Sequence, residues 1–227
     1  MNPRGVFVAG TDTGIGKTHA SVALLRAYRA QGCSAIGMKP IASGCRETAE
    51  GLRNDDAAAL IGASEPMPAY ELCNPYALPL AIAPHLAARD AGIEIALETI
   101  IDAYRKLAAR ADRVVVEGVG GWAVPLSDTM MQADLVRALG IPVLLVVGLR
   151  LGCINHALMS VRTVLADGCE LAGWIANRID PAMASAEANI DTLRERISAP
   201  LLGVIAHRGS SGDGDDIEAL SQAALQI

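Results

Sequence analysis

Near the beginning of the chain, GTDTGIGKTHAS at residues 10–21 has the residue types of a loop that binds phosphate groups. Five residues separate Gly10 from Gly16, one more than in the G-x-x-x-x-G-K-[ST] pattern, but the working tripeptide Gly-Lys-Thr is intact. Lys17 is placed to reach the β- and γ-phosphates of a nucleotide, and the Thr18 hydroxyl to ligate Mg²⁺. The alternative is a Gly-rich turn with an exposed lysine. In the first interpretation the backbone N–H groups that line the anion site are those of Gly14, Ile15, Gly16 and Lys17.

Acidic residues at two other places could complete a metal site. The apolar run RVVVEG ends in Glu117, and a strand that ends in a carboxylate is where folds of this kind hold Mg²⁺ or its waters. Asn54, Asp55 and Asp56 precede an Ala-rich helix, so one of them could simply be its N-cap. Asp56 is favoured as the second metal-side carboxylate, although spacing alone does not separate it from Asp55.

A second lysine follows another apolar run. In MKPIASG, Lys39 stands where a strand should end, with Ser43 in the turn that follows. A surface lysine is one interpretation. The other is an electrostatic clamp on a transferring phosphoryl group. The four histidines are scattered and no G-x-S-x-G elbow occurs, so nothing indicates nucleophilic catalysis.

These residues need a scaffold that brings them to one place. Apolar runs of strand length alternate with stretches of helical period, which predicts an α/β fold: a doubly wound, mostly parallel sheet flanked by helices, of the phosphate-loop NTPase type. The 227 residues predict a single domain, 1–227. Ligands bind beyond the carboxyl ends of the strands in such folds, so the loop, Lys39 and Glu117 are expected at one rim.

The predicted elements follow from the apolar runs and from glycines just past helix ends. Residues 63–84 hold five of the 11 prolines and predict a long surface connection before a helix near His85, and Gly209–Asp216 predicts a mobile loop. We expect strands at Gly5–Ala9, Ser34–Lys39, Arg113–Glu117, Pro142–Gly148, Leu171–Ala176 and Leu201–Ala206. We expect helices at Lys17–Gln31, Asp56–Gly62, Ile93–Ala109, Gln132–Leu139, Ile154–Asp167, Ala184–Ile197 and Asp215–Ala224.

Composition excludes several classes of protein. The net charge is −6 and no basic block occurs, which argues against nucleic-acid binding. The longest apolar run, Ile141–Leu149, is too short to cross a membrane, and no signal-peptide pattern is present, so we expect a cytoplasmic protein. The five cysteines are widely spaced without a C-x-x-C pair, which argues against a zinc site or a disulfide framework.

Seven stretches together resemble the dethiobiotin synthetase family, whose members close the ureido ring in biotin synthesis with ATP. They occur in the family order between about residues 6 and 206, and KPIASG, EGVGGW with PLSD, and LGCINH are specific as a set. The resemblance implies that 7,8-diaminononanoate forms a carbamate with CO₂ or bicarbonate, that ATP phosphorylates it, and that the second amine closes the ring. The stretches are GTDTGIGKT, GMKPIASG, GLRNDDAAAL, NPYALPLAIAPH, VVVEGVGGWAVPLSD, VVGLRLGCINHA and LAGWIAN.

The resemblance also implies roles for individual residues. Thr18, Asp56 and Glu117 would hold Mg²⁺ and its water shell. Lys39 would stabilise the carbamate and the transferred phosphoryl group, while Lys17 would supply charge at the phosphates. Thr13 and Ser43 would complete the catalytic set by hydrogen bonds to the diamine or its carbamate, and Asn177 would read the adenine edge. Further contacts to ATP are implied for Gly14, Ile15, Gly16, Gly118, Val119, Gly120 and Arg178.

In the family a second subunit completes each site. The LGCINH turn comes from the other subunit and binds the substrate carboxylate at a helix N-terminus. Here the donors would be Gly152, Cys153, Ile154 and Asn155. The resemblance therefore implies a homodimer with its active sites at the interface.

Two departures from the family pattern limit how far the family's residue roles can be assigned to this chain. Many members have an acidic residue at the position of Gly14, whereas others have Gly, so we interpret it as a permitted variant with one less negative charge near the phosphates. The family also has a proline after the last strand, where this chain reads Ile205-Ala206-His207-Arg208. The second departure leaves open how strictly ATP is preferred over other nucleotides.

Two alternatives share the same ATPase core. Partner-switching ATPases carry a second lysine five residues before the loop lysine, and that position is Asp12 here, which speaks against a non-enzymatic ATP switch. A glutamine-dependent amidotransferase would need an added glutaminase domain, for which 227 residues leave no room.

Overall fold

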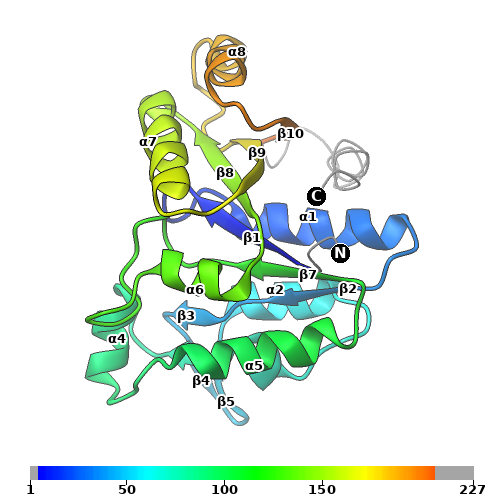
Figure 1. Ribbon diagram of the computed structural model, residues 1–227, viewed down its shortest axis with the longest axis vertical. Helices are drawn as coiled ribbons and strands as arrows, with labels where there is room; N and C mark the ends of the chain where they lie inside the picture. The colour runs from blue at the N-terminus through cyan, green and yellow to red at the C-terminus, as the bar shows by residue number, and fades with distance from the viewer. Residues whose placement is uncertain (1–4, 208–227) are drawn as a thin grey trace.

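The computed structural model describes residues 5–207, and its centre is a six-stranded sheet in which every pairing is parallel (Figure 1). The strand order is β10-β9-β8-β1-β7-β2, so the two neighbours of β1 come from much later in the chain. The predicted fold class is confirmed. The strands are β1 (Gly5–Gly10), β2 (Ala35–Met38), β7 (Arg113–Glu117), β8 (Val143–Leu149), β9 (Leu171–Arg178) and β10 (Leu201–Ile205).

Helices cover both faces of this sheet, because alternate side chains of each strand point to opposite faces. In β1, Phe7 and Ala9 pack on one face, and Val6 and Val8 on the other. The first face is covered by α5 (Leu97–Ala108), α6 (Gln132–Leu139), α7 (Cys153–Ala166) and α8 (Ala186–Arg196). The second face is covered by α1 (Lys17–Ala30) and α2 (Asp55–Ala63).

The prediction of a long surface connection at residues 63–84 is wrong. This segment contains α3 (Tyr70–Cys73) and β6 (Tyr76–Leu78), and β6 pairs in parallel with β3 (Ile41–Ser43). The side chains of Cys73 and Leu78 are fully buried. The prolines mark the ends of these short elements, and the pairing partner lies more than 30 residues away, where a local pattern does not reveal it.

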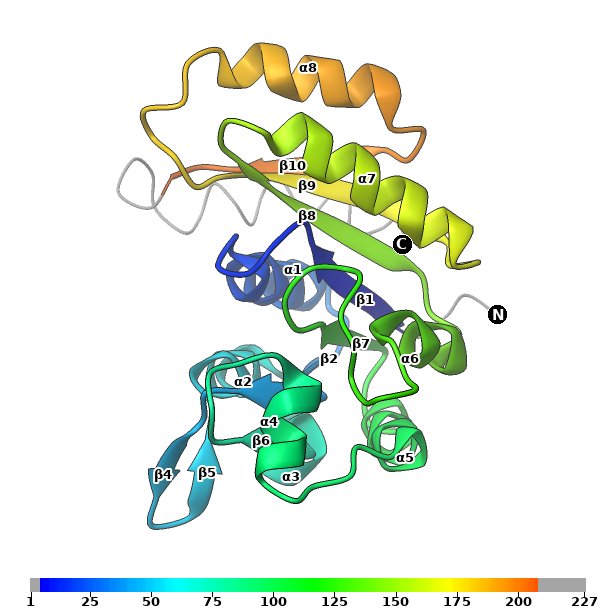
Figure 2. The ribbon, with the colours of Figure 1, turned by 90° about the vertical axis from the view of Figure 1, so that its left-hand side faces the viewer.

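Other differences from the predicted elements are small. The helix near His85 is α4 (Pro84–Asp90), whereas α5 begins at Leu97 and not at Ile93. An antiparallel hairpin of β4 (Arg46–Thr48) and β5 (Gly51–Arg53) was not predicted, and it projects beside α2 (Figure 2). The predicted loop at Gly209–Asp216 and the predicted helix at Asp215–Ala224 lie outside the described residues.

The carboxyl ends of four strands carry the polar residues singled out above. The phosphate loop follows β1, Lys39 follows β2, Glu117 ends β7 and Asn177 is the second-last residue of β9. Since these strands are parallel and adjoining or nearly so, the four points lie along one rim of the sheet. No helix within residues 5–207 is long and apolar enough to cross a membrane.

Candidate functional site at the carboxyl rim of the sheet

The phosphate loop ends in a left-handed glycine that starts α1. Gly16 has φ 87°, a conformation that glycine adopts without strain, and it is the N-cap of the helix. Lys17 turns back over the loop, and its Nζ donates to the carbonyl of Asp12 at 3.0 Å and to that of Gly120 at 2.6 Å. Burial, and then the positive charge of Lys39, lower the pKa of Lys17 to about 8.

A cluster of opposite charges lies beside this loop. Lys39 is 4% exposed, and its Nζ lies 2.5 Å from Oε1 of Glu117 and 3.1 Å from Oδ2 of Asp56. Oε1 of Glu117 also accepts a hydrogen bond from the Thr18 hydroxyl at 2.9 Å, while Oε2 is buried without a hydrogen-bond partner among the described residues. The last strand residue of β7 thus bridges the phosphate loop and the second lysine.

The pKa directions in this cluster follow from its charges. Burial alone would lower the pKa of Lys39, but the carboxylates of Glu117 and Asp56 outweigh it and raise the pKa above the ordinary value. Burial would raise the pKa of Asp56, but the charge of Lys39 and the hydrogen bonds that Lys39 and Thr18 donate to the carboxylate hold that pKa below its ordinary value. Both partners are therefore charged at neutral pH.

The three residues at the start of α2 have separate roles. Asn54 is the N-cap, and its side-chain oxygen accepts from the Ala57 N–H at 3.2 Å. Asp55 forms an exposed ion pair with Arg46 of the β4–β5 hairpin. Asp56 turns towards Lys39. The ambiguity between the two aspartates is thus decided by which of them faces the sheet.

A cavity of about 1220 Å³ opens over this cluster. Two residues that were predicted to contact ATP lie outside its lining: Ile15 is 2% exposed in the core, and Gly118 packs so closely on Phe7 that a Cβ would lie 2.8 Å from the ring. The predicted site residues that do line the cavity are Thr13, Gly14, Gly16, Lys17, Thr18, Lys39, Ser43, Asp56, Glu117, Val119, Gly120, Asn177 and Arg178.

The two predicted hydroxyl donors differ in their surroundings. The Oγ of Ser43 is buried and has no hydrogen-bond partner within the described part of the chain. Thr13 is exposed, and its backbone N–H donates to Oδ1 of Asp12 at 2.7 Å. Ser43 therefore has hydrogen-bonding capacity that the protein itself does not satisfy.

Asn177 supports the phosphate loop directly. Its side-chain nitrogen donates to the carbonyl of Ile15 at 2.7 Å, and it lies so near Gly16 that a Cβ there would come within 2.1 Å of it. The neighbouring Arg178 forms an ion pair with Glu187. Both residues line the cavity, but one donor of Asn177 is already used to hold the loop.

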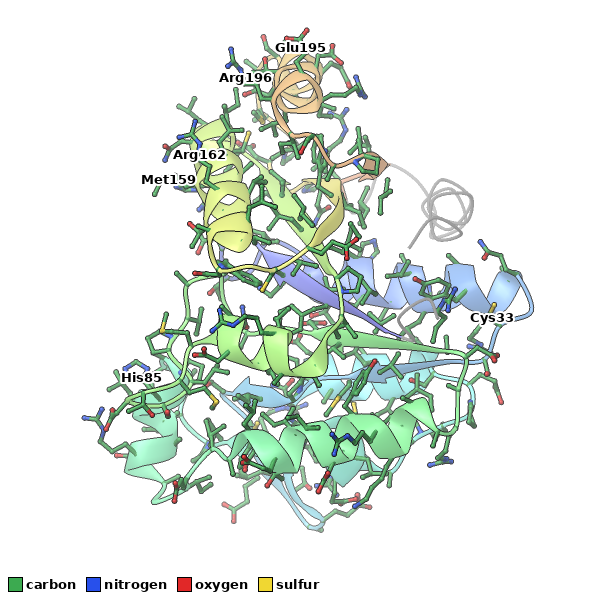
Figure 3. The ribbon with its side chains drawn as sticks, viewed as in Figure 1. Cys33, His85, Met159, Arg162, Glu195 and Arg196 are labelled. Atoms are coloured by element: carbon green, nitrogen blue, oxygen red, sulfur yellow. The ribbon has the colours of Figure 1, made fainter. Side chains whose placement is uncertain are left out.

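The turn at residues 151–155 lies apart from the cavity. Gly152, with φ 95°, is the N-cap of α7, Cys153 is buried, Ile154 is half-buried against the core, and Asn155 is exposed. Leu151 is 94% exposed. Met159 lies one helical turn after Asn155 in α7, on the side that faces away from the sheet (Figure 3). Within one chain, this turn is not brought to Lys39.

Sequence inspection missed residues that hold the loop after β7. Gln132 is 1% exposed, and its side-chain oxygen accepts from the Val119 N–H at 2.9 Å. Its side-chain nitrogen donates to the carbonyl of Gly121 at 2.8 Å. A polar residue at the start of α6 was the available signal, but a helix start is also an ordinary place for glutamine. The contact that fixes its role spans more than ten residues.

Arg150 was missed as well. It ion-pairs with Asp12 at 2.5 Å, so the position where the partner-switching ATPases have a lysine holds the acidic half of an ion pair.

The fold and the phosphate loop define a protein of the phosphate-loop ATPase class. The structure is similar to MinD of Aquifex aeolicus, with a TM-score of 0.56 and 16% sequence identity over 98% of this chain and 94% of that one. It is also similar to a ParA family ATPase from Chlorobium tepidum TLS, with a TM-score of 0.55 and 13% identity over 98% and 97% of the two chains. These likenesses concern the fold. The family model described as "AAA domain" matches residues 4–213.

Curated relatives narrow the class to a family. A protein of Xanthomonas oryzae pv. oryzae (strain PXO99A), named ATP-dependent dethiobiotin synthetase BioD, is 56% identical over 100% of this chain and 99% of its own length. The protein of the same name from Xylella fastidiosa (strain 9a5c) is 56% identical over 91% of this chain and 92% of its own. The chain belongs to the ATP-dependent dethiobiotin synthetase family, and it is an ATP-dependent ligase.

Proposed function

We propose that the protein carboxylates 7,8-diaminononanoate at the expense of ATP and closes the ureido ring of dethiobiotin. One amine takes up CO₂ to form a carbamate, whose oxygen attacks the γ-phosphorus of ATP and displaces ADP. The second amine then attacks the carbonyl carbon of the carbamic-phosphate anhydride, and phosphate leaves. The observation that carries the proposal is the buried Lys39, held between two carboxylates at the wall of a cavity whose other wall is the phosphate loop.

Lys17 and Lys39 supply the charge that such a reaction needs. Activating a carbamate oxygen by phosphoryl transfer requires positioning and charge neutralisation more than a strong base. In the proposal Lys17 leaves the carbonyls of Asp12 and Gly120 for the β- and γ-phosphates. Lys39 stabilises the carbamate and the phosphoryl group in transit, and Thr13 and Ser43 donate to the diamine or its carbamate. Asn177 and Arg178 line the same cavity, and in the proposal they contact the adenine end of ATP.

The residues present fit a magnesium ion. Thr18, Asp56 and Glu117 offer oxygen atoms only, which is the ligand set that Mg²⁺ takes, and Oε2 of Glu117 is a buried acceptor without a hydrogen-bond partner in the described part of the chain. No group of three or more His, Cys, Asp or Glu side chains suited to a metal occurs in residues 5–207, but Mg²⁺ at nucleotide sites takes one or two carboxylates, with phosphates and water as its other ligands. When bound, Mg²⁺ would neutralise charge on the phosphates of ATP.

The proposal includes a homodimer. Gly152, Cys153, Ile154 and Asn155 lie away from the cavity of their own chain, at the N-terminus of a 14-residue helix, where backbone N–H groups suit a carboxylate. The exposed Leu151 next to them is the kind of side chain that a subunit interface covers. In a dimer each turn would bind the carboxylate of the diamine held by the other subunit.

Incorporation of labelled bicarbonate tests the reaction. Purified protein is incubated with Mg-ATP, 7,8-diaminononanoate and labelled bicarbonate, and the acid-stable label is compared with ADP and phosphate. We expect one ADP and one phosphate for each acid-stable urea. If ATP binds but no label is fixed, the proposed substrate is wrong and the assignment to the ATPase fold stands.

A further inference from the structure

The phenol hydroxyl of Tyr70 joins two parts of the site that are distant in sequence. It accepts a hydrogen bond from the backbone N–H of Asn54 at 2.8 Å and donates one to Oδ1 of Asn74 at 3.0 Å. Asn74 is 3% exposed, and its side-chain nitrogen donates to the backbone carbonyl of Lys39 at 2.7 Å. Tyr70 itself lines no part of the cavity.

These contacts close a ring through the charged cluster. Asn54 is the N-cap of α2, and Asp56 follows it by two residues. The side chain of Asp56 meets Nζ of Lys39 at 3.1 Å, and the backbone of Lys39 leads back to Asn74 and Tyr70. The Lys39 N–H also donates to the carbonyl of Cys73 at 2.8 Å, so the lysine backbone has a second attachment. Hydrogen bonds of Tyr70 and Asn74 therefore connect the start of α2 with the backbone of Lys39.

We propose that Tyr70 is a positioning residue, whose hydroxyl sets the place of Asp56 relative to Lys39. Without the hydroxyl, the Asn54 N–H loses its acceptor and the first turn of α2 can move. The Asp56 carboxylate moves with this turn, while Lys39 stays held by Cys73 and Glu117. The guanidinium of Arg53, 4.1 Å from the centroid of the Tyr70 ring, keeps the ring in place when only the oxygen is removed. The inference rests on the proposed roles of Asp56 and Lys39.

The test is Tyr70→Phe, with Tyr76→Phe as its matched control. Tyr76 is also half-buried, and its hydroxyl also accepts from a backbone N–H just before a helix, that of Ala96 at 2.9 Å, but α5 carries no site residue. A misplacement of about 1 Å near reacting groups can cost about 100-fold in rate, so we expect kcat of Tyr70→Phe to fall about ten-fold. We expect Tyr76→Phe to stay within two-fold, with similar thermal unfolding of both variants.

A double-mutant cycle separates positioning from general support of the fold. If Tyr70 acts through Asp56, then Tyr70→Phe in the Asp56→Ala background has less than a two-fold further effect on kcat, because nothing remains to be positioned. A ten-fold loss in both backgrounds would overturn the inference, as would a Tyr70→Phe variant with wild-type kcat.

The cycle also distinguishes this inference from the proposed function. If Asp56→Ala slows turnover while Tyr70→Phe does not, the inference alone fails. A wild-type kcat of Asp56→Ala would contradict the proposed role of Asp56, and the inference about Tyr70 would fail with it.

Discussion

The two buried lysines of the site differ in what neutralises them. Lys17, in the phosphate loop, donates to two carbonyl groups, and its pKa is lowered to about 8. Lys39, after β2, lies against two carboxylates, and its pKa is raised. Within residues 5–207 no carboxylate forms an ion pair with Lys17, which therefore suits an incoming anion, whereas Lys39 is already neutralised by two carboxylates and keeps its position. The difference supports the proposal that the loop binds the nucleotide and that the charged cluster around Lys39 takes part in the chemistry.

Removal of the second lysine should have the largest effect. We expect Lys39→Ala to bind ATP with an affinity near that of the wild type and to turn over about 100- to 1000-fold more slowly, the scale of losing one oriented charge stabiliser. Steady-state kinetics and equilibrium binding of ATP would measure the two effects separately. Turnover near the wild-type rate would refute the role given to Lys39, and a parallel loss of ATP binding would remove the contrast between the two lysines.

The two adjacent aspartates provide a matched pair within the cluster. Asp56→Ala removes a carboxylate that is 3.1 Å from Lys39, and we expect kcat to fall about 10- to 100-fold. Asp55→Ala removes only an exposed ion pair with Arg46, which contributes little, so we expect a change within two-fold. Equal losses in the two variants would mean that the orientation of α2 does not select the functional carboxylate.

The pH dependence of ATP binding should show the smallest effect, and it concerns the first lysine. Because the pKa of Lys17 is about 8 and bound phosphates would raise it, binding takes up a proton above pH 8, and affinity falls as the pH rises. We expect about a five-fold weaker affinity at pH 9 than at pH 8, from the fraction of neutral lysine.

Isothermal titration in buffers of different ionisation enthalpy would detect this proton uptake. Lys17→Arg is the control, since arginine stays charged throughout this range and should abolish the dependence. A flat profile in the wild type would show that Lys17 is already fully charged in the free protein.

Local pattern predicted the part of the site that lies on the sheet. The loop, Lys39 and Glu117 each follow an apolar run, and parallel strands bring the ends of such runs to one edge, so their meeting is confirmed. The pairing of β3 with β6 and the hairpin of β4 and β5 were not predicted, because runs of three residues carry too weak a pattern.

The sequence by itself determined the six strands of the central sheet, the glycine-rich loop that follows β1 and the family, because each depends on residue types at fixed short spacings. Only the tertiary structure decided that Asp56 faces Lys39 while Asp55 faces solvent, and that Tyr70, Asn74 and Gln132 hold the site together. Those contacts are ion pairs between side chains and hydrogen bonds from side chains to other side chains or to backbone, and most of them join segments that are distant in sequence. Their geometry exists only after packing has placed the two segments within about 3 Å of each other.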